Sequence, residues 1–202
     1  IIKARQEREK LEEARHSDEV VDEENKQSIY DEHISIFGIP VVFADFSLLE
    51  GRASIRLPKD FTEQSEEEIA SVYYLGSKPQ TVFSNGYLNF MAAFHWTGNL
   101  ITDGNIFDFT RFAKQAIERI GPKSRILNVE KRKQGEHSVA ILEFLAQTID
   151  SVNYNVMFFA SIEERLLIGS ITFDQKYVKR LQPLALEIAR SFRIMDEKEE
   201  LV

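Results

Sequence analysis

Alternating hydrophobic and polar positions predict strands in the first part of the chain. In "ASIRLPKDF", residues 53–61, apolar side chains occupy every second position at the start, as in a strand with one buried face. Pro58 cannot donate a hydrogen bond to a strand ladder, so we expect the strand to end there. Phe61 follows, and we expect its ring to close the edge of the core. A strand within 41–49 and a turn at 50–51 complete a predicted hairpin.

A second hairpin is predicted around Asn85-Gly86. This dipeptide suits a type I′ turn, and it lies between the strand-like stretches 81–83 and 87–90. The segment before it, 62–73, is polar and acidic. It is predicted to hold either a short helix or a loop.

Two later segments have the periodicity of amphipathic helices. Apolar residues at three-to-four spacing predict one helix over 106–120, ended by Gly121-Pro122, and another over 175–192. Asp174 is the expected cap of the second helix, and Pro183 predicts a kink or a delayed start. Four strand-like stretches stand between the helices, near 125–132, 137–148, 153–161 and 165–173. Their short connections favour an antiparallel meander.

This order of elements predicts an α+β fold, with an antiparallel sheet and two main helices in an α/β/α sandwich. The 202 residues include 43% hydrophobic residues and 15 Phe, which is enough for a core. We place one domain at 31–196, a charged helical tail and linker at 1–30, and a loose tail at 197–202. The first tail is rich in helix formers but has few apolar positions, which indicates a solvated helix. The alternative is a juxtamembrane or partner-binding helix.

Three motifs in this order resemble the PsbP-like fold. "ASIRLPKDF" is similar to its opening strand, which ends in Pro and an aromatic residue. "FDFTRFAKQAIERI" is similar to its first helix, and "LLIGSITFDQKYVKRLQPLALEIARSFRI" to its last strand, final helix and closing Ser-Phe pair. The resemblance covers residues 41–195.

The PsbP-like fold is shared by the PsbP subunit of photosystem II, a small Ran-binding nuclear transport protein and many bacterial domains. The resemblance therefore implies protein–protein interaction, in some members chaperone-like or at a membrane. Two features depart from it. Residues 1–28 and "ISIFGIP" have no obvious counterpart, and Phe61 stands where Trp is common.

Charge and composition narrow the chemistry. The net charge of −8 and pI of about 5.2 argue against nucleic acid as the partner, because phosphate binding needs a concentrated basic face. The compact basic run Lys131–Lys133 is interpreted as a solvated hairpin end. The chain has no cysteine, which excludes disulfides and thiolate sites. No nucleotide-binding glycine motif or complete calcium loop is present, so we expect no cofactor and no metal.

The candidate functional surface is the polar stretch from Trp96 to Asn105, predicted to be the longest loop of the domain. Loops on a rigid scaffold are where binding sites usually lie. The predicted binding residues are His95, Trp96, Asn99, Asp103 and Asn105, with Tyr87 and Phe90 from the preceding hairpin. A remote alternative is a hydrolase in which His95 works with Asp103, Asp108 and a serine. No nucleophile elbow supports it, so no catalytic residue is assigned.

The leading hypothesis is a non-catalytic module that binds a protein partner, as an adaptor or in a chaperone-like role. An open, aromatic face of the sheet is one expected surface, formed by Phe83, Tyr87, Phe90, Phe94, Phe144, Phe158 and Phe159. The alternative is a domain with a pocket for a small molecule or lipid. The expected location is cytoplasmic or membrane-tethered. Tethering is the expectation if a membrane segment precedes Ile1, because two apolar residues followed by charges are typical of the end of such a segment.

Overall fold

The computed structural model describes residues 26–73, 78–148 and 151–195 of the chain. The predicted solvated helix near the N-terminus and the tail at 197–202 lie outside the described residues. Among the described helices, none is both long and apolar enough to cross a bilayer.

A seven-stranded antiparallel sheet is the centre of the structure. Its spatial order is β5-β6-β7-β11-β10-β9-β8. The bounds are β5 (Thr62–Glu63), β6 (Thr81–Ser84), β7 (Phe90–Leu100), β8 (Arg125–Gln134), β9 (His137–Gln147), β10 (Val152–Ile162) and β11 (Arg165–Asp174). Strands β8 to β11 follow one another in the sheet as they do in the chain, so the predicted meander is confirmed.

A smaller sheet contains the first predicted hairpin. Strands β3 (Phe43–Leu48) and β4 (Ala53–Pro58) pair in antiparallel register, with β12 (Arg193–Ile194) on the other side of β4. Pro58 is the last residue of its strand, as predicted. The Phe61 side chain is buried, and its ring centroid lies 5.0 Å from that of Phe90, which confirms its expected place in the core.

The apolar segment before this sheet forms a hairpin of its own, which the sequence analysis did not predict. Strands β1 (Ile34–Ile36) and β2 (Ile39–Val41) pair across a turn at Phe37-Gly38. Both turn residues have positive φ, 54° and 73°, as the primed turns of tight hairpins require.

Both predicted main helices are present. Helix α4 (Ile106–Ile120) follows the 3-10 turn η1 (Asp103–Asn105), and α5 (Val178–Ser191) follows η2 (Gln175–Tyr177). Asp174 caps the second turn by accepting a hydrogen bond from the Lys176 backbone N–H. The polar segment 62–73 contains α3 (Glu66–Val72), which begins with a capping box between Ser65 and Glu68.

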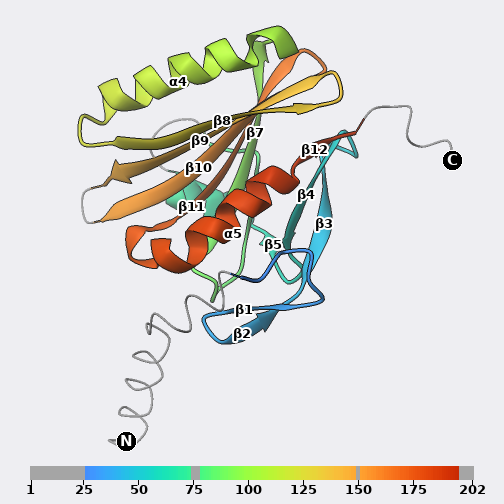
Figure 1. The fold of residues 1–202 in the computed structure, drawn as a ribbon, viewed down its shortest axis with the longest axis vertical. Helices are drawn as coiled ribbons and strands as arrows, with labels where there is room; N and C mark the ends of the chain where they lie inside the picture. The colour runs from blue at the N-terminus through green and yellow to red at the C-terminus, as the bar shows by residue number, and fades with distance from the viewer. Residues whose placement is uncertain (1–25, 74–77, 149–150, 196–202) are drawn as a thin grey trace, which may run out of the picture.

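The elements form layers around the large sheet (Figure 1). Helix α4 covers one face, while α5 and the three-stranded sheet lie on the other face. Alternate residues of the central strands therefore point into two separate cores. Phe158 belongs to the core under α5, and its neighbour Phe159 belongs to the core under α4. The α+β class and the sandwich of helices around a sheet are confirmed.

Two local predictions are wrong. Asn85-Gly86 does not form a two-residue type I′ turn, because neither residue has a positive φ. Instead Asn85 Oδ1 accepts hydrogen bonds from the backbone N–H groups of Tyr87 and Leu88, and Asn89 adopts the left-handed conformation (φ 60°). The stretch after Trp96 is not a long loop either. Strand β7 continues to Leu100, because its far end still pairs with β11.

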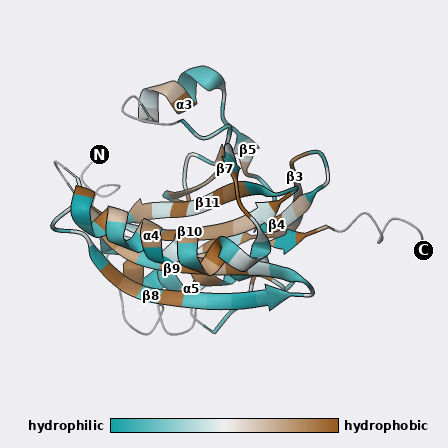
Figure 2. Cartoon of the chain, turned by 90° about the horizontal axis from the view of Figure 1, so that it is seen from above, coloured by the Kyte–Doolittle hydropathy of each residue, from teal (hydrophilic) through white to brown (hydrophobic). Residues whose placement is uncertain are grey.

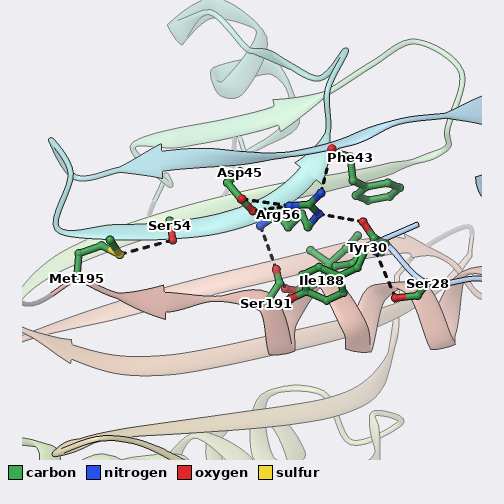
Figure 3. Close-up of polar contacts among 10 residues, drawn as sticks. Ser28, Tyr30, Phe43, Asp45, Ser54, Arg56, Ile188, Ser191 and Met195 are labelled. Atoms are coloured by element: carbon green, nitrogen blue, oxygen red, sulfur yellow. Dashed lines mark hydrogen bonds and ion pairs between the residues drawn. The ribbon is translucent and has the colours of Figure 1, made fainter. Parts of the chain in front are cut away.

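The Arg56 side chain holds the segment before β1 against the domain (Figure 3). Its guanidinium donates to both carboxylate oxygens of Asp45 at 3.1 Å and to the Ile29 carbonyl at 2.9 Å. The Arg56 backbone N–H donates to Ser191 Oγ of α5 at 3.0 Å. Ile29 is completely buried, so the folded part begins before residue 31, the boundary that the sequence analysis set.

Candidate functional site

Among the described residues, helices cover only part of the face of the large sheet on the side of α4. Helix α4 packs on β8, β9 and β10, and α3 covers β6 and β7 through Ile69, which contacts Val82 and Ala93. Strand β11 lies between the two helices (Figure 2). The side chains on this strip are half-buried, and we call them the open strip: His95, Met157, Ile168, Ser170 and Thr172.

The register of the strands aligns these side chains in cross-strand rows. His95 is opposite Ile168, and Ser170 is opposite Met157. Thr172 is opposite Asn155, and its hydroxyl donates to Asn155 Oδ1 at 2.9 Å. The strip is therefore apolar at Met157 and Ile168, which pack against the border of the core under α4, and polar around them.

The flank of α4 turned away from β8 carries two exposed apolar side chains. The Phe107 ring lies 5.1 Å from Lys131 Nζ and so marks the flank that meets β8. At 100° per residue, Phe112 and Ile120 fall on the opposite flank. Phe112 is 61% exposed and Ile120 is 84% exposed. We call these two residues the α4 flank.

A second concave feature lies at Trp96. It is a cleft of about 190 Å³ between the β3–β4 turn and strands β6 and β7, with walls that include Leu48, Phe83, Phe94 and Trp96. The Arg165 guanidinium stacks 3.9 Å from the centroid of the Trp96 ring. Trp96 Nε1 donates to the Ile162 carbonyl at 3.3 Å. Trp96 is thus a half-buried anchor between the core and this cleft.

The predicted binding residues are not brought together in one surface. Phe90 is buried at 5% exposure, while Tyr87 is 40% exposed in the connection before β7. Asn99 lies near the end of β7, and Asn105 ends η1. The hypothesis of an open aromatic face is wrong. Of its seven rings only Tyr87 is exposed, because alternate strand positions place Phe83, Phe90, Phe94, Phe144, Phe158 and Phe159 in the two cores.

The residues of the remote hydrolase hypothesis are also separated. Asp103 does not pair with His95. Its carboxylate lies 3.2 Å from His137 Nδ1 and accepts a hydrogen bond from the Ser138 backbone N–H at 2.6 Å. His95 lies five residues before Leu100 along β7, about 16 Å from the strand end. Asp108 instead pairs with Arg111. In the described ranges, no group of three or more His, Asp or Glu side chains is arranged to hold a metal ion.

A buried polar cluster under α5 was missed by the sequence analysis. Glu143 on β9 is 4% exposed and accepts a hydrogen bond from Gln182 Nε2 of α5 at 2.6 Å. Burial raises the pKa of the neighbouring Tyr154 hydroxyl, and the Glu143 charge raises it further. Tyr154 therefore stays protonated near neutral pH. The signal in the sequence was the single acid inside the apolar run "VAILEFLA".

Comparison with known proteins identifies the fold. No family model and no curated protein sequence matches the chain. The solution structure of cyanobacterial PsbP (CyanoP) from Synechocystis is similar, with a TM-score of 0.58 at 12% identity, over 76% of this chain and 92% of that one. A Pseudomonas aeruginosa protein of unknown function gives a TM-score of 0.41 at 11% identity, covering 70% and 90%. That second likeness is too low to support a conclusion.

The domain is thus an α+β protein with a PsbP-like fold, as its motifs suggested. At 12% identity the likeness to the cyanobacterial protein establishes the fold alone. A fold of this kind does not by itself specify a function, so the function has to be argued from the surface.

Proposed function

We propose that this domain is a non-catalytic module that binds a protein partner, and that the open strip and the α4 flank form its contact surface. The observation that carries the proposal is the exposure of Phe112 and Ile120, at 61% and 84%, on the flank of α4 turned away from β8, together with the half-buried Met157 and Ile168 of the sheet. Large exposed apolar side chains at the border of an uncovered sheet are typical of interaction sites. Aromatic residues and methionine are also enriched at interfaces.

Polar and charged groups on both faces of the sheet hold elements of the fold together, which supports a contact function over catalysis. The Asp103–His137 pair joins η1 to the start of β9. The Glu143–Gln182 contact joins β9 to α5. These groups already bind elements of the fold to one another, and they lie away from the open strip.

The cleft at Trp96 supports a second candidate, binding of a small apolar ligand. Its volume of about 190 Å³ exceeds the 150 Å³ of a cavity that takes up benzene. It is smaller than the roughly 300–1,000 Å³ of usual ligand pockets. The cleft therefore suits one ring or one side chain of a partner better than a whole lipid, and we rank it second.

Affinity capture from an extract of the source organism, with three forms of the chain in parallel, tests the proposal. These are the unmodified chain, the double variant Phe112→Gln/Ile120→Gln, and Leu100→Gln as the control. Leu100 is matched because it is 83% exposed but lies at the end of β7. We expect a partner that the unmodified chain and the control retain and that the double variant loses by at least tenfold.

Two results would count against the proposal. Equal recovery by all three forms would show that the α4 flank is not the contact surface. If titration of the purified candidate against the unmodified chain gave no binding, the protein-binding function itself would be refuted. All three forms should melt within a degree or two of one another, because only exposed side chains are changed.

A further inference from the structure

The two edge strands of the large sheet differ in length and in what lies beside them. The edge at β5 is two residues long, and α3 lies beside it. The other edge is β8, which is ten residues long and pairs only with β9 among the described strands. Every second residue of an antiparallel edge strand directs its backbone N–H and C=O away from its neighbour. Such an edge is a template for an added strand.

Contacts with the end of α5 hold strand β8 in place on that face of the sheet. The side chains of Arg132 and Gln134 donate to the carbonyls of Arg190 and Phe192, each at 2.6 Å, at the end of α5. Glu130 pairs with the Arg190 guanidinium at 2.7 Å. These contacts order the edge before any partner arrives, which lowers the entropy cost of binding.

A shallow groove runs along this edge on the α4 face of the sheet. Its volume is about 560 Å³, and it lies between α4, at Lys114 and Glu118, and the first half of β8. Leu127 and Val129 border it and are 38% and 37% exposed. Because side chains of a strand alternate between its faces, every second side chain of an added strand would enter this groove.

The exposed charges along β8 are positive. Arg125, Lys131 and Lys133 are exposed, whereas the acid of this strand, Glu130, is occupied by Arg190. The whole chain carries a net charge of −8, so this row stands out against an acidic surface. Three exposed bases suit a short acidic peptide, while nucleic acid binding needs a larger basic face.

We propose that β8 binds an acidic peptide segment of a partner protein, which adds to the sheet as an extended antiparallel strand. This inference rests on the proposed protein-binding function and names the partner's chemistry. Backbone hydrogen bonds supply the affinity, and the groove at Leu127 and Val129 selects β-branched side chains. The bulge after Ile126 limits the pairing to the remaining part of the strand.

A displayed library of random twelve-residue peptides, selected on the full chain, tests this inference. We expect enrichment of peptides in which Glu or Asp alternates with Val, Ile or Thr. A synthetic peptide from the enriched set should bind Lys131→Glu/Lys133→Glu at least tenfold more weakly than the unmodified chain. The control Lys59→Glu/Lys78→Glu makes the same charge change at exposed positions in the connections before β5 and β6, and should leave the affinity unchanged.

Hydrogen exchange of the backbone amides distinguishes an added strand from simple charge attraction. Bound peptide should slow exchange at alternate residues of β8, which is the pattern of a new ladder. Enriched peptides that are not acidic, or that bind both double variants equally, would overturn the inference. So would protection spread evenly over β8, or pairing of β8 between two copies of this chain.

Binding of the peptides to the α4 flank would separate the two proposals. If Phe112→Gln/Ile120→Gln abolished binding and Lys131→Glu/Lys133→Glu did not, the protein-binding function would stand and the β8 inference would fall. If single-stranded DNA bound as tightly as the peptide and depended on the same lysines, the peptide specificity would also be refuted.

Discussion

Gly169 on β11 tests how tightly the core under α5 is packed. A Cβ atom placed on this glycine would lie 2.0 Å from Phe158 Cζ and 2.3 Å from Cε2. Phe158 is opposite Gly169 in the neighbouring strand, and its ring is completely buried. That ring also packs 5.0 Å from Phe192 and 6.2 Å from Phe94, measured between centroids. The Phe158 ring therefore has no open space to move into.

Gly169→Ala is expected to destabilise the protein substantially. Real Cβ contacts essentially never come closer than 3.0 Å, so the ring must shift by about an ångström or the strands must separate. Overpacking of this kind costs about 1–3 kcal/mol. The gain from replacing a glycine in a strand is about 0.5–1 kcal/mol and acts in the opposite direction. The net loss expected is about 0–2.5 kcal/mol of unfolding free energy, with a central value of about 1 kcal/mol.

Urea unfolding followed by the fluorescence of Trp96 measures this loss. The matched control is Gly98→Ala on β7, where an added Cβ meets nothing within 4 Å, so only the gain of about 0.5–1 kcal/mol from replacing a strand glycine is expected. Phe158→Leu removes the clashing ring, so Ala at position 169 should cost at least 1 kcal/mol less in that background. The packing argument would be refuted if Gly169→Ala were as harmless as the control, or if the two changes were additive.

Three further predictions concern single contacts. Arg56→Ala should lower the unfolding free energy by about 2–3 kcal/mol, because charge-assisted hydrogen bonds are lost. It should also speed hydrogen exchange near Ile29, and unchanged exchange there would contradict the anchoring. Trp96→Phe removes the hydrogen bond to Ile162 and should cost about 1 kcal/mol in urea unfolding. Circular dichroism follows this variant, because the single Trp of the chain is gone, and no measurable loss would refute the prediction. The Ser65 hydrogen bonds lower the pKa of Glu68. The capping box therefore stabilises α3 fully above the unfolded pKa of Glu68, and this stabilisation is lost as the pH falls through the folded pKa. Carboxyl NMR titration should show that the Glu68 pKa rises in Ser65→Ala, and no rise would contradict the capping box.

Local patterns were enough to predict most of the elements. The helix 106–120 and the four strands of the meander follow from apolar spacing and short connections, because these signals lie within a few residues of one another. The end of the strand at Pro58 is also a local effect, because proline has no backbone N–H to donate to the strand ladder. The PsbP-like fold could be suggested because these motifs occur in a fixed order.

The candidate surface was harder to predict, since exposure depends on what covers each strand. The polar stretch after Trp96 has the composition of a loop, yet pairing with β11 keeps it extended to Leu100. Periodicity marked Phe112 as part of an apolar stripe but not as the side chain left uncovered. The aromatic rings alternate along their strands, and only the layers decide which core receives them.

The sequence by itself therefore determined the class of fold, the order of the two main helices and the strands of the meander, and the absence of cysteine chemistry. Tertiary structure alone decided that one face of β11 is left half-buried between α3 and α4, and that β8 is the long edge of the sheet among the described strands. The physical reason is that hydrophobic periodicity records which residues leave water, whereas coverage depends on contacts between segments far apart in the chain. Asp103, for example, meets His137, 34 residues away, and not His95.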